Sequence, residues 1–235
     1  GDEIGTFSQN FDRMVDALQR EMEHRSAFVA DFSHELKTPM TSLIGYADLL
    51  RTRRLSEDEK FRYANAIYKN GKRLETLSTR MLSLLHLSST PLELTTVDVS
   101  KLGKRLGQLF SAGTLTVELE PAQVRGAELL LTLLRNLVEN GQKASENTPV
   151  TVTGVRDGER YRFSVIDQGS GMTAEQVQRA TEPFYKGDRS RSSGGFGIGL
   201  SLCQRICQRH GTVLAIESEP SVGTTVSFWL EVCNG

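Results

Sequence analysis

The chain has 235 residues, of which 38% are hydrophobic and 24% are charged, and its formal net charge is −1. This length and composition indicate one large domain or two smaller ones with packed cores. The near balance of charge excludes a dedicated nucleic-acid-binding protein, which would carry an excess of basic residues. No apolar run approaches the roughly 18 residues that a membrane-spanning helix needs.

The first predicted element in chain order is a long helix over residues 2–54. Its beginning has the alternating steps of three and four residues that are typical of a coiled-coil seam. The apolar residues of this seam are Ile4, Phe7, Phe11, Met14 and Leu18.

A second helix is predicted from the turn near Leu55 to Leu87, because Ser56 and Glu59 form a capping box at its start. Two antiparallel helices joined by a short turn leave an apolar face that one hairpin cannot bury alone. We therefore expect a homodimer in which two hairpins form a four-helix bundle. The apolar stripe of the second helix comprises Leu74, Leu77, Met81, Leu84 and Leu85.

Residues 88–91 have the composition of a linker, and after them the pattern changes to mixed α and β. Asp157 and Gly158 are predicted to turn a β-hairpin. The predicted helices cover residues 99–110, 126–145 and 197–209, and the predicted strands cover residues 114–119, 150–156, 160–167, 212–218 and 224–231.

The three cysteines, Cys203, Cys207 and Cys233, are predicted to be free thiols. Their number is odd and no second cysteine or histidine pair accompanies them, which argues against a zinc site. Free thiols fit a reducing cytoplasm.

His34 differs from the other histidines, His24, His86 and His210, which we interpret as ordinary polar surface residues. Glu35 can hold the proton on one imidazole nitrogen, which leaves the other nitrogen nucleophilic. Pro39 falls inside the predicted helix, where a proline costs roughly 3 kcal/mol. On spacing alone, a kinked structural helix with incidental polar residues is an equal alternative.

The segment His34-Glu35-Leu36-Lys37-Thr38-Pro39 resembles the phospho-acceptor box of sensor histidine kinases. The resemblance implies that His34 is phosphorylated and that Glu35 acts as its base. It also implies that Thr38 helps to position water for dephosphorylation of a partner response regulator.

Three further segments contain residues suited to binding a nucleotide. In the first, Asn136, Asn140 and Lys143 follow helical spacing and are expected to share one face. An amide oxygen is a hard ligand suited to Mg²⁺, and a lysine on that face would offset phosphate charge. Taken alone, this segment is better explained as a solvated polar face.

The second segment, Asp167-Gln168-Gly169-Ser170-Gly171, follows a predicted strand. The carboxylate of Asp167 is suited to accept the exocyclic amine of a base, and the glycines let the chain approach a flat ligand. An ordinary turn is the alternative. The third segment, residues 194–200, opens a helix with glycine amides that can cradle phosphates.

Between the last two segments, residues 181–193 are rich in serine, arginine and glycine, as in a lid over a bound nucleotide. Phe184 and Tyr185 are expected to anchor this lid. The basic residues Lys186, Arg189 and Arg191 are expected to reach phosphates. A surface loop without a ligand is the alternative.

In order and spacing these segments resemble the nucleotide-binding boxes of the same family, whose ATP-binding domain is shared with gyrase, Hsp90 and MutL-type ATPases. The resemblance implies Mg²⁺ at Asn140 and adenine at Asp167, with Thr225 of the Gly-Thr-Thr segment near the adenine. The full set of expected ATP-binding residues is Asn136, Asn140, Lys143, Asp167, Gly169, Gly171, Phe184, Tyr185, Lys186, Arg189, Gly195, Gly197, Gly199, Leu200 and Thr225.

The resemblance implies a multidomain chain, with an all-α dimerising hairpin followed by an α/β sandwich ATP-binding domain. We expect the last helix of a HAMP-like module over residues 1–22, the phospho-acceptor domain over 23–90 and the ATP-binding domain over 91–235. The implied cofactors are ATP and Mg²⁺, and the implied partner is a response regulator. A HAMP-like module further implies a cytoplasmic position next to a membrane span outside this sequence.

Three other functions are alternatives to this interpretation. An ATPase of the same superfamily is disfavoured by the segment around His34, and a non-catalytic scaffold is disfavoured by the intact His34, Asn140 and Asp167. An enzyme whose main output is dephosphorylation of its regulator stays open because of Thr38.

Overall fold

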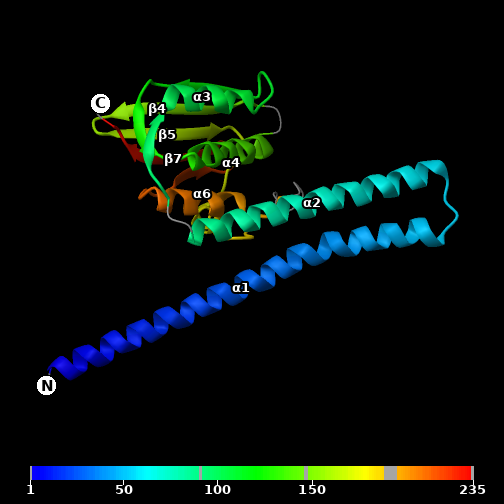
Figure 1. Ribbon diagram of the computed structural model, residues 1–235, viewed down its shortest axis with the longest axis horizontal. Helices are drawn as coiled ribbons and strands as arrows, with labels where there is room; N and C mark the ends of the chain where they lie inside the picture. Colours follow the sequence, from blue (N-terminus) through cyan, green and yellow to red (C-terminus); the bar gives the residue numbers. More distant parts are fainter. Residues whose placement is uncertain (1, 90–91, 146–147, 188–194, 234–235) are drawn as a thin grey trace. The chain divides into compact units, whose positions relative to one another are not determined.

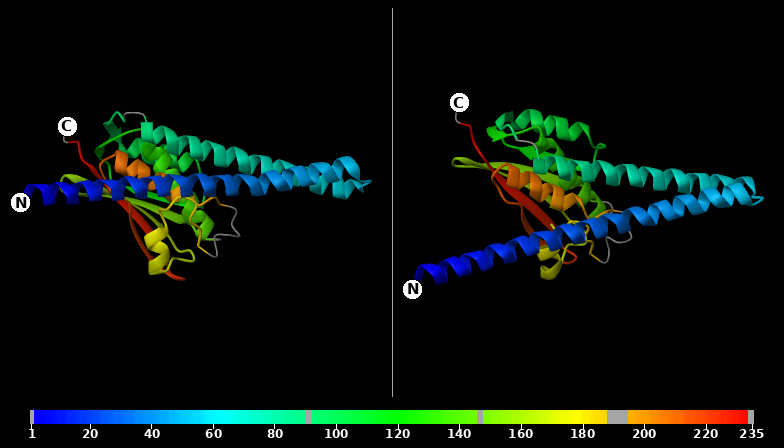
Figure 2. Two further views of the ribbon diagram at one scale, coloured as in Figure 1. Left: turned by 90° about the horizontal axis from the view of Figure 1, so that it is seen from below. Right: turned by 60° about the horizontal axis from the view of Figure 1, so that its bottom comes forward.

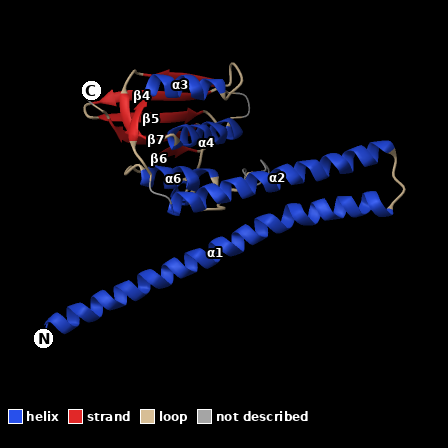
Figure 3. Ribbon diagram, in the orientation of Figure 1, coloured by secondary structure: helices blue, strands red, loops and turns tan. Residues whose placement is uncertain are grey.

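The computed structural model describes residues 2–89, 92–145, 148–187 and 195–233 (Figure 1). The chain divides into two compact units, Gly1–Leu77 and Ser78–Gly235. The first unit is entirely helical, whereas the second combines a helical tail with helices and a sheet (Figure 3). Among the described residues, no helix has both the length and the apolar character that crossing a bilayer requires.

The first unit is a helical hairpin made by α1 (Asp2–Thr52) and most of α2 (Glu57–Ser89). The predicted capping box is confirmed, since the Glu59 amide donates to Ser56 Oγ at 3.3 Å and the Ser56 amide donates to Glu59 Oε2 at 2.9 Å. Tyr46 and Tyr63 stack across the hairpin with ring centroids 5.5 Å apart. The two predicted helices are therefore present, with a short turn between them.

Large apolar side chains remain exposed along this hairpin. Phe61 is 74% exposed, Tyr68 64% and Ile44 61%. In the N-terminal part of α1, the predicted seam residues Phe7 and Leu18 are 73% and 59% exposed. The hairpin by itself thus leaves its apolar face uncovered, as its sequence pattern indicates.

The second unit contains a five-stranded sheet with the order β2-β4-β5-β7-β6. Only β2 and β4 run parallel, and the other neighbours are antiparallel. The helices α3 (Val99–Gln108), α4 (Leu129–Ala144) and α6 (Gly199–Arg209) lie along one side of the sheet (Figure 2), which confirms the α/β sandwich. The strands are β2 (Leu115–Leu119), β4 (Val150–Asp157), β5 (Arg160–Asp167), β6 (Ala215–Glu219) and β7 (Gly223–Glu231).

The core of this unit forms where α4 packs on β4 and β5. Alternate residues of β5 face the helices, and Tyr161 and Phe163 are fully buried there. Phe163 stacks on Phe228 of β7, with ring centroids 5.1 Å apart. On the helix side, Leu133 and Leu134 of α4 are fully buried. Each such side chain contributes roughly 1.5–3 kcal/mol of burial free energy, so α4 is held firmly against the end of β5.

Three short elements were not predicted. The strands β1 (Thr95–Asp98) and β3 (Gln123–Gly126) pair in an antiparallel ladder, and α5 (Ala174–Arg179) precedes the predicted lid. Because residues 123–126 are extended, α4 begins at Leu129 instead of residue 126. The start of α5 carries a capping box between Thr173 and Gln176.

The last turns of α2, Ser78–Ser89, belong to the second unit although the helix is continuous. Leu84 and Leu87 are each 8% exposed. Arg209 of α6 donates to the Leu87 carbonyl at 2.6 Å. The folding unit around the sheet therefore includes residues that precede the predicted linker.

The interpretation of His210 as an ordinary surface residue was wrong. Its Nε2 accepts a hydrogen bond from the Ala127 amide at 3.2 Å, and its Nδ1 lies 2.8 Å from the Ile206 carbonyl. These contacts fit a neutral imidazole that carries its proton on Nδ1. Burial, with a smaller contribution from the nearby Arg209 charge, lowers the pKa of His210, while the bond to Ile206 opposes this change.

We predict that the second unit loses stability in mild acid because of His210. A folded-state pKa below that of the unfolded chain means that the unfolded state takes up the proton first. The stabilisation is complete above the unfolded pKa of about 6.5 and is lost as the pH falls through that value towards the folded pKa. Urea unfolding followed by the fluorescence of Trp229, the one tryptophan, should show a lower midpoint at pH 5.5 than at pH 7.5.

The matched variant is His210→Gln, whose amide can replace both hydrogen bonds without titrating. Its unfolding midpoint should fall less between the two pH values than that of the wild type. An equal fall in both proteins would assign the acid sensitivity to other groups.

The cysteine prediction is confirmed: Cys203 and Cys207 are buried free thiols and Cys233 is a half-buried one. Burial raises the pKa of Cys207 to about 12 and that of Cys203 well above its usual range. Both thiols of α6 are therefore packed inside the unit in their neutral form.

Candidate functional site

His34 is exposed on α1, with the half-buried Glu35 beside it. One turn further on, the hydroxyl of Thr38 donates to the His34 carbonyl at 3.4 Å. The helix continues through Pro39, which is buried and supplies no amide for the Glu35 carbonyl. An exposed imidazole next to a carboxylate is accessible to a phosphoryl donor and can be kept nucleophilic.

The second candidate site begins at Asn140, which lies against the first residue of α6. A Cβ added to Gly199 would lie 3.0 Å from both Nδ2 and Oδ1 of Asn140, so the amide group and the helix start are in contact. The N-cap residue of α6, Ile198, makes no side-chain hydrogen bond to the amides of the first turn. Such a helix N-terminus carries a partial positive charge that suits phosphate.

Asp167, at the end of β5, is brought next to this part of α4 by a glycine. A Cβ on Gly141 would lie 3.2 Å from the Cβ of Asp167, which shows how closely the helix and the strand approach. Asp167 Oδ1 accepts the Gly169 amide at 2.9 Å, and the Thr224 amide also bonds to the carboxylate. Partial burial raises the pKa of Asp167 and the two amide bonds oppose that rise.

The glycines after Asp167 are required by close packing of the backbone. A Cβ on Gly169 would lie 2.5 Å from the carbonyl of Ala144. Gly171 has a φ of +60°, and a Cβ there would overlap the Glu219 carbonyl oxygen. These positions hold the loop against α4 and β6, so their role includes the shape of the site as well as room for a ligand.

Gly197 joins the predicted lid anchor to the start of α6. Its carbonyl accepts the Phe184 amide at 3.0 Å. Its φ is +71°, and a Cβ would lie 2.5 Å from the Tyr185 carbonyl oxygen. Tyr185 is covered by the guanidinium of Arg179, 4.3 Å from the ring centroid. Phe184 and Tyr185 therefore pack at the glycine-rich segment.

The other predicted residues of the third segment and the lid are Lys186, Arg189, Gly195 and Leu200. Lys186 and Gly195 are half-buried, and Leu200 is half-buried in the first turn of α6. A Cβ on Gly195 would meet no atom within 4 Å. Arg189 lies outside the described residues.

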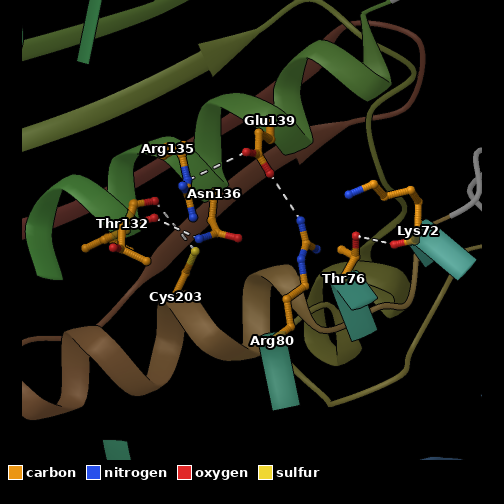
Figure 4. Close-up of polar contacts among 9 residues, drawn as sticks. Lys72, Thr76, Arg80, Thr132, Arg135, Asn136, Glu139 and Cys203 are labelled. Carbon is orange, nitrogen blue, oxygen red and sulfur yellow. Dashed lines mark hydrogen bonds and ion pairs between the residues drawn. The ribbon is translucent and has the colours of Figure 1, made fainter. Parts of the chain in front are cut away.

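Asn136 does not have the open position that the spacing predicts. It is 3% exposed, and its Nδ2 donates to the Thr132 carbonyl one turn earlier at 2.8 Å (Figure 4). Asn136 therefore lies in the interior, where its amide already has a hydrogen-bond partner. A role in packing explains this position. Asn140 and Lys143 stay at the surface of α4.

The expectation for Thr225 also needs correction. In the ladder between β5 and β7, Asp167 lies opposite Thr224, and Ile166 lies opposite Thr225. Since side chains alternate along a strand, Thr224 shares the face of Asp167 and Thr225 points to the other face. Thr224 is 8% exposed and its hydroxyl lies 2.8 Å from Ser218 Oγ. The two-residue period of the predicted strands would have identified Thr224.

Lys143 lies one turn after Asn140. Partial burial of its ammonium group lowers its pKa, the charge of Arg80 lowers it further, and the carboxylate of Glu139 opposes both effects. The residue still presents exposed surface. Lys143 is thus an exposed residue with a partly buried ammonium group on the same helix as Asn140.

Comparison with protein families gives two matches that together cover most of the chain. Residues 24–89 match the His Kinase A (phospho-acceptor) domain. Residues 126–234 match the histidine kinase-, DNA gyrase B- and HSP90-like ATPases. His34 lies in the first match, and Asn140, Asp167 and Gly199 of α6 lie in the second.

Among curated proteins, the sensor histidine kinase YkoH of Bacillus subtilis is 30% identical over 244 residues, covering 100% of this chain and 54% of YkoH. The heme sensor protein HssS of Staphylococcus saprophyticus is 30% identical over 237 residues, covering 97% of this chain and 51% of HssS. The chain thus spans about half the length of the curated relatives it matches.

Among solved structures, the histidine kinase ThkA in complex with the response regulator TrrA has a TM-score of 0.75 at 21% identity, covering 92% of this chain and 64% of ThkA. The histidine kinase ShkA in complex with AMPPNP has a TM-score of 0.61 at 24% identity, covering 88% of this chain and 46% of ShkA. These two likenesses support the fold. The two family matches and the curated relatives show that the chain belongs to the sensor histidine kinases.

Proposed function

We propose that the chain transfers the γ-phosphoryl group of ATP to His34 and then to an aspartate of a response regulator. The observation that carries this proposal is the exposed imidazole of His34 in a phospho-acceptor domain, in the same chain as an ATPase domain whose Asn140 amide touches the start of α6. A nucleophile and a phosphate-binding helix start are the two parts that such a transfer requires.

The residues of the second unit fit ATP. The carboxylate of Asp167, partly withdrawn from water, would accept the amine of adenine, with Thr224 on the same face. The amides of Gly199 and Leu200 and the ammonium of Lys143 would meet phosphate oxygens. Crystallisation of ShkA with AMPPNP is in line with nucleotide binding by this fold.

The amide oxygen of Asn140 suits a Mg²⁺ ion, which prefers oxygen ligands and keeps several waters and phosphate oxygens. Bound there, the ion would offset the charge that develops on the transferred phosphoryl group. Asn140 would provide this amide oxygen at the point where the first residue of α6 contacts α4.

At the acceptor, Glu35 would take the proton from the imidazole and keep one ring nitrogen nucleophilic. Thr38 is exposed one turn after His34, and its hydroxyl would orient water. We therefore include phosphatase activity towards the regulator in the proposed function.

The partners follow from the exposed surfaces and the relatives. The apolar face of the hairpin, with Phe61 at 74% exposure, supports a homodimer that forms a four-helix bundle. The complex of ThkA with TrrA supports a response regulator as acceptor. We retain the HAMP-like assignment of residues 1–22, with domains over 23–90 and 91–235, and a cytoplasmic position at a membrane, as proposals.

The test is incubation of the 235-residue chain with γ-labelled ATP and Mg²⁺. We expect label that is lost in acid and survives base, as a phosphorus–nitrogen bond requires, and that disappears when a chelator removes Mg²⁺. Acid-stable label would indicate a hydroxyl acceptor and contradict the proposal. Released phosphate without labelled protein would favour a simple ATPase.

A further inference from the structure

Glu139, the residue before Asn140 in α4, lies between two guanidinium groups (Figure 4). Arg80 Nη2 is 3.1 Å from Glu139 Oε2, and Arg135 Nε is 3.7 Å from Glu139 Oε1. The side chain of Arg80 is 17% exposed and that of Glu139 33%. This ion pair is therefore partly withdrawn from water, where charges act more strongly on their neighbours than at an open surface.

Arg80 reaches this position from the last turns of α2, which belong to the same folding unit as α4. Its link to Glu139 joins residues far apart in the sequence, unlike the pair of Glu139 with Arg135 within α4. Arg80 thus provides the shorter of the two contacts that hold the Glu139 carboxylate.

Positive charges outnumber the carboxylate at Glu139. Arg80 and Arg135 both pair with it, and Lys143 lies one turn further along α4. Burial lowers the pKa of Lys143 most, and the charges of Arg80 and Glu139 act on that pKa in opposite directions. An unpaired carboxylate immediately before Asn140 would repel a triphosphate bound there.

We propose that Arg80 is a positioning residue for the triphosphate, because it holds and neutralises the Glu139 carboxylate beside the Asn140 site. This inference rests on the proposed function, since it requires ATP to bind at Asn140. It assigns to the end of α2 a role in nucleotide affinity in addition to packing.

The experiment measures binding of ATP and of adenosine by calorimetry, with KM and kcat of autophosphorylation, in the full 235-residue chain. Arg80→Met keeps an unbranched apolar stem and removes the charged guanidinium group. We expect ATP binding and KM to weaken on the order of tenfold, with little change in adenosine binding or kcat. Adding Glu139→Gln to Arg80→Met should restore ATP affinity, and Arg80→Lys should retain part of it.

Glu139→Gln alone supplies a second test that leaves Arg80 in place. It is expected to bind ATP at least as tightly as the wild type, because the negative charge is gone. The matched control is Arg105→Met, which breaks an exposed 3.4 Å pair with Glu128 at the opposite end of α4 and should leave ATP affinity unchanged.

Two results would overturn the inference. Equal losses of ATP and adenosine affinity in Arg80→Met, without recovery on adding Glu139→Gln, would show that Arg80 only supports packing. Weaker ATP binding by Glu139→Gln alone would show that the carboxylate itself is needed. Failure of the wild type to bind ATP would instead reject the proposed function, so the two failures are distinguishable.

Discussion

Replacing His34 with alanine is expected to abolish ATP-dependent labelling of the chain while ATP binding persists. The exposed imidazole is the proposed nucleophile, and alanine removes both ring nitrogens without disturbing a buried contact. Alanine also has the highest helix propensity, so α1 should be preserved. Labelling with γ-labelled ATP and calorimetric titration with ATP, on the same protein samples, measure the two properties separately.

His24, the other histidine of α1, provides the control. His24→Ala should label like the wild type. Label that persists in His34→Ala would move the acceptor elsewhere and leave the His34 segment as a kinked structural helix. Loss of ATP binding in the same variant would reveal misfolding and not the loss of a nucleophile.

Asn140→Asp is expected to lower ATP affinity and labelling by about a hundredfold or more. The two side chains have nearly the same shape, so the contact with Gly199 should survive. The substitution removes an N–H donor and adds a second carboxylate next to Glu139, facing the proposed triphosphate. Titration with ATP in the presence of Mg²⁺ measures the effect on binding, and labelling measures the effect on transfer.

Gln142→Glu is the matched control, since it makes the same amide-to-carboxylate change two residues further along α4. The Gln142 side chain donates to the Thr114 carbonyl at 3.3 Å, away from the proposed site. This variant should keep most of its ATP affinity. Equal losses in both variants would mean that any added negative charge on α4 is harmful and that Asn140 has no special position.

The long helices and the main strands could be predicted because their apolar residues follow a clear period. The capping box at Ser56 and the turn at Gly158 confirmed that local signals set the ends of these elements, the latter with a φ of +61°. The ladder of β1 and β3 was missed because four-residue strands have too few positions to show a period. The capping box of α5 at Thr173 was visible in the sequence and was overlooked.

The sequence predicted the types of residue in the site better than the directions in which their side chains point. Asn136 and Asn140 share helical spacing, yet Asn136 is buried, whereas Asn140 is half-buried against Gly199 of α6. Thr224 and Thr225 differ only in the strand face that they occupy. Arg80 carries no motif, because its partner Glu139 is distant in sequence and only tertiary packing brings them together.

The continuation of α2 into the second folding unit bears on how such chains can be recombined. The phospho-acceptor match ends at residue 89, whereas the second unit begins at Ser78. A crossover at residue 90 would combine the ATPase sheet with a foreign helix end and replace Leu84 and Leu87 together with Arg80. A crossover near Leu77 would keep that sheet with its own helical tail, so the natural joint for exchanging modules lies inside a helix and not in the loop that follows it.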